Sequence, residues 1–521
     1  MNGAQALIRT LVDAGVDVCF MNPGTSEMHF VAALDDVREM RGVLALFEGV
    51  ATGAADGYAR MADKPAATLL HLGPGLGNGL ANLHNARKGH VPVVNIVGDH
   101  ATYHKQYDAQ LESDIETVAA NVSSWIRTTA SVEEVGSDAA DAVAVASGPP
   151  AQVATVILPA DVCWLEGAQP ASPVAPAQPA EVDAATISEV AEILTGGEPA
   201  ALFLGGKACR ADALVHASRI TNTTGSKLLA ETFPARIERG AGRVPVERLA
   251  YLAEFASMQL DGLKHLILVD SKSPVSFFAY PDKASDLVPE GCTVHVLASR
   301  ENDVEGALAA LAEAVKAPAD AATIQPEIRP ELPTGPLTAE AVCQAVGALL
   351  PEGAIVSDEG NTSGLFAAGL TAGAPAHDWM CLTGGAIGQG LPLAGGAAVA
   401  CPDRKVIVLH ADGAAMYTPQ SWWTMSRENL DVVTVIFNNS SYAVLNMELA
   451  RVGATEGGEK AKEMLDISRP DLDFVNLARG MGIPGARVSR ATTAEEFNEQ
   501  FKAAVDAKGP SVIEAIVPSI I

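Results

Sequence analysis

The feature that most constrains the fold is a repeated alternation of short apolar runs with longer stretches of helical periodicity. Runs such as "VPVVNIVGD" at 91–99, "HLILVD" at 265–270 and "KVIVLHADG" at 405–413 have the length and composition of buried strands. Similar runs occur at 66–72, 154–161, 201–206, 292–298, 353–360, 432–439 and 511–517. Strands that alternate with helices form parallel sheets with helices on both faces. We therefore predict an α/β fold built from doubly wound parallel sheets.

Two segments rich in proline and alanine divide this alternation into thirds. They lie at 166–186 and 316–336 and show neither helical nor strand periodicity. A chain of 521 residues also exceeds the size of one ordinary hydrophobic core and corresponds to about three domains. We predict these domains at residues 1–165, 186–316 and 337–521.

Composition argues against several classes of partner and site. The chain has 35 Lys and Arg against 63 Asp and Glu, a net charge of −28, which disfavours binding to nucleic acid or to anionic membranes. Its seven cysteines are scattered without a C-x-x-C pair, so neither a disulfide framework nor a zinc site is expected. No signal segment and no apolar run of membrane-spanning length occurs, so we expect a cytoplasmic protein.

Polar residues follow several predicted strands, and the most informative pair is Asp412 and Asn439. They lie 27 residues apart, with a predicted helix between them. A right-handed crossover brings the ends of two such parallel strands together. A carboxylate, a carboxamide and the backbone carbonyl of Ser441 are oxygen ligands that suit Mg²⁺, and the amides of Gly413 and Ala414 can hold an anion. We predict a magnesium–diphosphate site here; the alternative is that Asp412 only caps a helix.

A second acidic residue, Glu48, stands alone in the segment "LALFEGVATGAADGYAR" at 44–60. Most of its neighbours are too small or too apolar to solvate a charge. One interpretation is a capping or first-turn glutamate near a helix dipole. The other is a carboxyl group sheltered from water for acid–base chemistry.

The pattern "ADG" at 411–413 followed by "NN" at 438–439 resembles the thiamin diphosphate fingerprint of the pyruvate decarboxylase/acetolactate synthase superfamily. The family pattern begins Gly-Asp-Gly, and this chain has Ala411 at the first position. The resemblance extends over nearly the whole chain and implies three domains, called pyrimidine-binding, middle and diphosphate-binding. It implies that Asp412, Asn439 and the Ser441 carbonyl bind Mg²⁺.

The same resemblance implies how the other segments meet the cofactor. Glu48 would face N1′ of the aminopyrimidine. In "CLTGGAIGQGLP", Ile387 matches the apolar residue beneath the bent cofactor, and the Gly385 carbonyl matches the acceptor for the 4′-amino group. In "DEGNTSG", Asn361 and Thr362 match polar groups that approach the diphosphate. Because Glu48 of one chain would serve the cofactor on its partner, we expect a homodimer at least, and a homotetramer as the full assembly.

Three N-terminal segments resemble benzoylformate decarboxylase more than other members. "NPGTSEMHF" carries Ser26 at the position of a substrate-binding serine, and "LLHLGPGLGNGLANLHNA" carries His71 at the position of a proton-relay histidine. "FEGVATGAADGYA" completes the set. The resemblance implies non-oxidative decarboxylation of a 2-oxo acid, with carboligation as a further capacity.

Two departures separate this chain from benzoylformate decarboxylase. The segment 273–286 should supply a second histidine, but it has Phe278 and Ala279 there and contains no histidine. Glu448 falls where an apolar residue should meet an aromatic substrate. Glu448 is either a pocket residue, acting as a base or binding a cationic or hydroxylated substrate, or an exposed helix residue. Benzoylformate itself is therefore not the expected substrate.

Two alternative functions stay open. The last third also resembles the large subunit of acetolactate synthase, although Leu111 replaces the glutamine of that family's Phe-Gln-Glu signature and no long carboxyl arm follows the last predicted strand. No FAD-binding segment stands out, so FAD is not expected. The other alternative is a degenerate homologue that binds the cofactor without turnover. His100 and His104 form an i, i+4 pair without a third ligand, so we interpret them as pocket or solvent residues.

Overall fold

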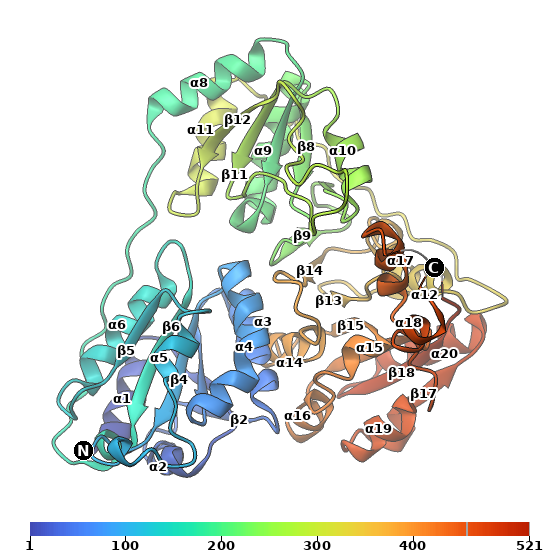
Figure 1. The fold of residues 1–521 in the computed structure, drawn as a ribbon. Helices are drawn as coiled ribbons and strands as arrows, with labels where there is room; N and C mark the ends of the chain where they lie inside the picture. The colour runs from blue at the N-terminus through green and yellow to red at the C-terminus, as the bar shows by residue number, and fades with distance from the viewer. Residues whose placement is uncertain (455–456, 520–521) are drawn as a thin grey trace.

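The chain forms three β-sheets that pack against helices, in a computed structural model that describes residues 1–454 and 457–519 (Figure 1). The sheet orders are β2-β1-β3-β4-β6-β5, β10-β8-β7-β11-β12 and β17-β18-β16-β15-β13-β14-β9. Every described strand pair is parallel except β9 with β14. The predicted fold class is therefore confirmed.

The first sheet belongs to the N-terminal part of the chain. Its strands are β1 (Val18–Met21), β2 (Arg41–Leu44), β3 (Ala66–Leu70), β4 (Val93–Asp99), β5 (Trp125–Thr128) and β6 (Val153–Pro159). Its helices are α1 (Gly3–Asp13), α2 (Met28–Ala33), α3 (Glu48–Ala62), α4 (Leu72–Gly89), α5 (Ile115–Ala119), α6 (Val135–Ser147) and α7 (Ala160–Trp164). All residues of β3, β4 and β6 are buried, as expected for parallel strands covered on both faces.

The second sheet is built from β7 (Ala200–Leu204), β8 (Lys227–Ala230), β10 (Glu247–Arg248), β11 (His265–Val269) and β12 (Thr293–Ala298). Its helices are α8 (Ala184–Thr195), α9 (Ala211–Thr224), α10 (Ala253–Leu260) and α11 (Val304–Ala314). Strand β9 (Ile237–Arg239) belongs to this part of the sequence, but it pairs with β14 of the third sheet. The predicted domain limits stay predictions, and residues 520 and 521 at the end of the third domain lie outside the described residues.

The third sheet has, besides β9, the strands β13 (Ile355–Glu359), β14 (His377–Cys381), β15 (Val406–Ala411), β16 (Val432–Asn438), β17 (Val488–Ala491) and β18 (Ser511–Ile516). Its helices are α12 (Ala339–Leu349), α13 (Ala367–Leu370), α14 (Gly390–Ala400), α15 (Asp412–Ala415), α16 (Ser421–Arg427), α17 (Ala443–Arg451), α18 (Glu459–Glu463), α19 (Phe474–Gly480) and α20 (Ala494–Asp506). Numbered within each domain, the first and third sheets share the strand order 2-1-3-4-6-5, apart from β9.

Helices α3 and α14 join the first and third domains, which lie side by side in Figure 1. A Cβ atom at Gly57 would lie 1.9 Å from the Leu393 carbonyl oxygen, and one at Gly396 would lie 1.8 Å from the Ala54 carbonyl oxygen. Only glycine allows the two helix backbones to approach this closely. The contact fixes α3, and with it Glu48 at the start of α3, relative to the third sheet.

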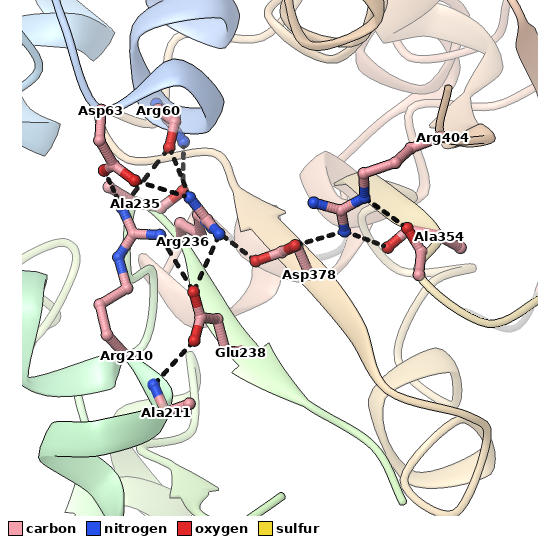
Figure 2. Close-up of polar contacts among 11 residues, drawn as sticks. Arg60, Asp63, Arg210, Ala211, Ala235, Arg236, Glu238, Ala354, Asp378 and Arg404 are labelled. Carbon is pink, nitrogen blue, oxygen red and sulfur yellow. Dashed lines mark hydrogen bonds and ion pairs between the residues drawn. The ribbon is translucent and has the colours of Figure 1, made fainter. Parts of the chain in front are cut away.

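An ionic network, buried at Asp378 and exposed at Asp63, connects all three domains where β9 joins the third sheet (Figure 2). Arg236, just before β9, donates to Asp378 on β14 at 2.5 Å and to Asp63 after α3 at 3.2 Å. Arg404 donates to the other Asp378 oxygen at 2.5 Å, and Arg210 on the middle domain donates to Asp63 at 2.8 Å. Burial alone would raise the pKa of Asp378, but the two arginines outweigh it and hold the pKa below its ordinary value.

No helix among the described residues combines the length and the apolar composition needed to cross a membrane.

Candidate active site

Four segments with predicted cofactor roles follow four neighbouring parallel strands of the third sheet. Strands β16, β15, β13 and β14 lie side by side in that order. Their carboxyl ends lead into residues 439–441, 412–415, 360–364 and 382–389. The strand order reverses between β13 and β15, and ligands of open α/β sheets bind in the crevice at such a point. The sheet thus brings together segments that span 80 residues of sequence (441 − 361 = 80).

Asp412 and Asn439 meet at the ends of β15 and β16, as their spacing predicted. The Asp412 side chain is buried, with Oδ2 accepting the backbone N–H groups of Asn439 at 3.0 Å and Ser440 at 2.7 Å, while Oδ1 accepts that of Gly413 at 2.7 Å. Burial raises the pKa of Asp412, and these backbone bonds oppose the shift. The N-cap residue of α15 is Ala411, so the alternative of a capping aspartate is wrong.

The oxygen atoms around Asp412 fit a hard divalent cation. No basic side chain of the described chain forms an ion pair with this buried carboxylate. Asn439 Oδ1 accepts the N–H of Ser441 at 3.0 Å, which keeps the amide beside the same turn. Since a buried, unpaired carboxylate is costly, a bound cation would offset its charge. No cluster of three His, Cys, Asp or Glu side chains suited to a metal occurs in the described residues; the set here combines one carboxylate with an amide and a carbonyl.

Glu359, the last residue of β13, stabilises the loop that carries Gly385 and Ile387 through hydrogen bonds. The Glu359 carboxylate accepts the backbone N–H groups of Gly388 at 2.6 Å and Gly390 at 2.5 Å. Burial raises the pKa of Glu359, and His410, whose Nε2 lies 3.4 Å from Oε2, opposes this shift. Gly385 has a φ of +73°, which favours glycine. Nothing in the sequence indicates a role for Glu359, because its hydrogen-bond partners lie about 30 residues further along the chain.

Asn361 and Thr362 lie in the turn that follows β13, at the same edge of the sheet as Asp412. Asn361 has a φ of +48°, a left-handed conformation that asparagine tolerates better than most residues. Asn361 is exposed and Thr362 is half-buried. Both side chains are therefore accessible from the carboxyl end of the sheet.

Glu48 is the first residue of α3, and its side chain is only 7% exposed. Asn78 on α4 donates to Glu48 Oε2 at 3.0 Å. A Cβ at Gly75 would lie 3.1 Å from Oε1, so α4 packs closely against the carboxyl group. Glu48 therefore lies in the first turn of α3, as the first interpretation predicted. Its side chain is also sheltered beside α4.

Ser26 and His71 lie together where the strand order of the first sheet reverses, between β1 and β3. They meet through Glu27, a residue that sequence analysis did not single out. Glu27 Oε2 lies 2.8 Å from His71 Nδ1, and Ser26 Oγ donates to Glu27 Oε1 at 2.6 Å. The Glu27 side chain is 1% exposed and that of His71 is 24% exposed. The only signal in the sequence was a carboxylate next to the predicted serine.

Comparisons with known proteins agree with this arrangement. A family profile described as "Thiamine pyrophosphate enzyme, N-terminal TPP binding domain" matches residues 1–121, and one described as the C-terminal TPP binding domain matches residues 358–515. A Mycobacterium tuberculosis protein with the provisional name acetolactate synthase large subunit IlvX is 60% identical over 523 residues, covering 100% of both chains. The chain belongs to the thiamine pyrophosphate enzyme family.

Two further relatives agree with membership of this family. Benzoylformate decarboxylase of Pseudomonas aeruginosa is 28% identical and aligns over 97% of each chain. The solved structure of the thiamine diphosphate-dependent 4-hydroxybenzoylformate decarboxylase of Rhodococcus jostii RHA1 superposes over 99% of each chain with a TM-score of 0.87. Its sequence identity is 24%, so this likeness concerns the fold. The chain therefore belongs to the superfamily that includes decarboxylases and acetolactate synthases, as the motifs predicted.

In this thiamine pyrophosphate enzyme, Glu448 is not an exposed helix residue, and that alternative is wrong. Its side chain is 12% exposed, and Oε1 accepts from Arg451 at 3.0 Å. The Arg451 guanidinium lies 4.2 Å from the ring centroid of Tyr280 and donates to Glu254 on α10 at 2.8 Å. These contacts hold helix α17 against the middle domain. The second oxygen, Oε2, is buried without a hydrogen-bond partner in the described residues.

The segment 273–286, which lacks the expected histidine, still borders the predicted cofactor loop of the enzyme. A Cβ at Gly385 would lie 2.6 Å from the Phe277 ring. Phe277 and Tyr251 have ring centroids 5.2 Å apart, and Phe277 and Phe278 lie 4.9 Å apart. Aromatic side chains thus occupy the position for which the resemblance implied a histidine. His100 and His104, whose ring centroids are 5.3 Å apart, lie in the loop after β4.

Proposed function

We propose that this enzyme uses thiamin diphosphate and Mg²⁺ to cleave the carbon–carbon bond between the carboxylate and the carbonyl of a 2-oxo acid. The proposal includes carboligation as a further capacity of the same site. The observation that supports it best is the meeting of four predicted cofactor segments at the ends of β16, β15, β13 and β14. We also propose a cytoplasmic location, because all seven cysteines are free, as is usual in a reducing compartment.

In this proposal the third domain holds the diphosphate end of the cofactor. Asp412, Asn439 and the Ser441 carbonyl bind Mg²⁺, and the nearby groups that approach the diphosphate are the amides of Gly413 and Ala414 and the side chains of Asn361 and Thr362. With the cofactor bound, the Gly385 carbonyl would accept a hydrogen bond from its amino group, and Ile387 would support it as an apolar contact. When bound, the cofactor supplies an electron sink next to the bond that breaks.

The first domain supplies the proton-transfer groups. Glu48 holds a proton at N1′ of the pyrimidine, His71 moves a proton at its Nε2 atom, and Ser26 anchors the substrate. The family resemblance implies a homodimer at least, and a homotetramer as the full assembly, in which Glu48 serves the cofactor of the partner chain.

A second candidate is condensation of two 2-oxo acids of the acetolactate synthase type. It is favoured by the provisional name of the relative that is 60% identical. The third candidate is a degenerate homologue that binds the cofactor without turnover, which the missing histidine in 273–286 leaves open. All three share one cofactor site and differ in their product.

One assay separates the three candidates. Protein purified with thiamin diphosphate and Mg²⁺ is offered pyruvate, benzoylformate and branched or aromatic 2-oxo acids, and CO₂, aldehyde and acyloin are followed. Aldehyde supports the decarboxylase, acetolactate supports the synthase, and no product despite tight cofactor binding supports the degenerate homologue. Glu48→Gln should lower turnover by about 10²- to 10⁴-fold and keep most of the cofactor affinity. The exposed Glu181→Gln is the control; unchanged turnover of Glu48→Gln would remove its assigned role.

A further inference from the structure

We propose that Glu27 is a positioning residue for His71, whose Nδ1 proton it holds so that proton transfer occurs at Nε2. The inference rests on the proposed function, because that function makes His71 the proton-transfer group. Its place in the first sheet, where the strand order reverses between β1 and β3, is also where a ligand crevice is expected.

The Glu27 carboxylate is surrounded by hydrogen-bond donors on both oxygens. Oε2 accepts the backbone N–H of Gly24 at 2.6 Å and faces His71 Nδ1 at 2.8 Å. Oε1 accepts from Ser26 Oγ at 2.6 Å. A Cβ at Gly98, on β4, would lie 1.7 Å from Oε1, so the strand leaves no room for the carboxylate to turn away. The group is therefore fixed in one orientation.

This geometry determines which nitrogen of His71 carries the proton when the ring is neutral. An ionised carboxylate only accepts hydrogen bonds, so the 2.8 Å contact requires that Nδ1 carries a proton. Nε2 makes no hydrogen bond to any residue in the described chain, and the side chain is 24% exposed. Nε2 is thus the atom that can exchange a proton with a ligand in the crevice.

The ring of His71 is also fixed in place. A Cβ at Gly24 would lie 2.2 Å from His71 Nδ1, so the absence of a side chain at Gly24 makes room for the imidazole. Ser26 Oγ lies 3.3 Å from the same nitrogen. Substrate anchor and proton-transfer group are thereby held by one carboxylate.

The test compares Glu27→Gln, Glu27→Asp and His71→Ala in the full-length enzyme loaded with thiamin diphosphate and Mg²⁺. The control is Asp161→Asn, which removes another buried carboxylate of the same domain, one that accepts from Thr102 instead of a histidine. Two readouts are collected for each variant. One is kcat and KM on the 2-oxo acid that gives most product; the other is the tautomer of the His71 ring from ¹⁵N NMR, assigned by its absence in His71→Ala.

We expect neutral His71 in the unchanged enzyme to carry its proton on Nδ1. In Glu27→Gln, turnover should fall about 10- to 100-fold with little change in KM. The glutamine amide can present either its oxygen or its NH₂ group to Nδ1, so the ring signals should show that the Nδ1-protonated form is no longer the single neutral form. Glu27→Asp keeps a group that only accepts hydrogen bonds, so the Nδ1-protonated form should stay although turnover falls. Asp161→Asn should match the unchanged enzyme.

Each other outcome has a definite meaning. A neutral ring protonated on Nε2, or a Glu27→Gln variant with unchanged kcat and ring signals, overturns the proposal. If Glu27→Gln does not fold, Glu27→Asp and the tautomer of the unchanged enzyme still decide it. Full turnover in His71→Ala would instead overturn the proposed role of His71, and the ring signals would then report the Glu27 contact alone.

Discussion

Asp412 Oδ2 accepts the backbone N–H of Asn439 at 3.0 Å, so a carboxylate at the end of β15 organises the turn at the end of β16. The two residues are 27 positions apart and lie on neighbouring parallel strands. The same carboxylate is buried and has no basic partner in the described chain. A single residue therefore both shapes the turn and provides the negative charge that a cation would meet there.

Asp412→Asn should weaken Mg²⁺-dependent cofactor binding by at least about tenfold, which corresponds to about 1.4 kcal/mol. The amide has no negative charge, and its NH₂ group would face backbone N–H donors. Calorimetric titration of the cofactor with and without Mg²⁺ measures the effect. Asp403→Asn, on an exposed turn before β15, is the control and should bind normally. Equal affinity in both variants would contradict a metal role for Asp412.

Glu359→Gln should loosen the loop that carries Gly385 and Ile387. Glutamine offers one acceptor oxygen, so one of the N–H groups of Gly388 and Gly390 loses its partner, at a cost of about 1–3 kcal/mol. We expect lower unfolding free energy and weaker cofactor binding in the same variant. Urea unfolding and cofactor titration measure the two effects.

The matched control for this variant is Glu352→Gln, an exposed residue just before β13. It should change neither quantity, because surface substitutions away from special features usually stay within about 0.5 kcal/mol. A loss of stability in Glu359→Gln without any loss of cofactor affinity would mean that the loop does not support the cofactor.

The strands that sequence analysis identified are mostly those in the interior of the sheets. Of the strands in the described chain, it did not identify eight (β1, β2, β5, β8, β9, β10, β14 and β17), and five of these, β2, β5, β9, β10 and β17, lie at sheet edges. Edge strands are short and partly exposed; β5, for example, has no fully buried residue. An apolar run marks best the strands that are covered on both faces, although the run at 292–298 also predicted the largely exposed edge strand β12. The fold class followed mainly from the interior strands.

Some residues of the candidate site could likewise be predicted from the sequence, and others could not. Asp412 and Asn439 could be paired from sequence because one strand–helix–strand unit connects them and the crossover rule fixes their proximity. Glu27 and Glu359 could not be recognised, because their roles depend on contacts with residues 44 and about 30 positions away. Such contacts arise from tertiary packing, and local periodicity carries no information about them. The contact between Arg451, which pairs with Glu448, and Glu254 of the middle domain was hidden for the same reason.

Gly57→Ala should destabilise the contact between the first and third domains. The new methyl group would lie 1.9 Å from the Leu393 carbonyl oxygen, and overpacking of this kind costs about 1–3 kcal/mol. Gly480→Ala, at the end of α19, meets no atom within 4 Å and is the control. It should be neutral or slightly stabilising. Thermal unfolding of both variants checks the difference, and equal transition temperatures would show that α3 and α14 do not need this close approach.

Asp378→Asn should destabilise the junction of the three domains by about 3 kcal/mol at neutral pH, because Arg236 and Arg404 would lose a buried anionic partner. The pKa of Asp378 is lowered in the folded state, so the folded state binds fewer protons than the unfolded chain. The stabilisation by Asp378 is therefore present above the unfolded value of about 3.9 and is lost as pH falls from there through the folded pKa.

The difference in unfolding free energy between Asp378→Asn and the unchanged enzyme should accordingly be constant from pH 7 to about pH 5 and shrink below about pH 4. Urea unfolding at each pH measures this difference, and taking a difference cancels the other titrating groups that both proteins share. Asp506→Asn breaks an exposed pair with Lys502 and should cost no more than about 1 kcal/mol at any pH. A difference for Asp378→Asn that stays constant down to pH 3 would mean that the arginines do not lower the pKa of this carboxyl group, and that the junction is stabilised by its backbone hydrogen bonds instead.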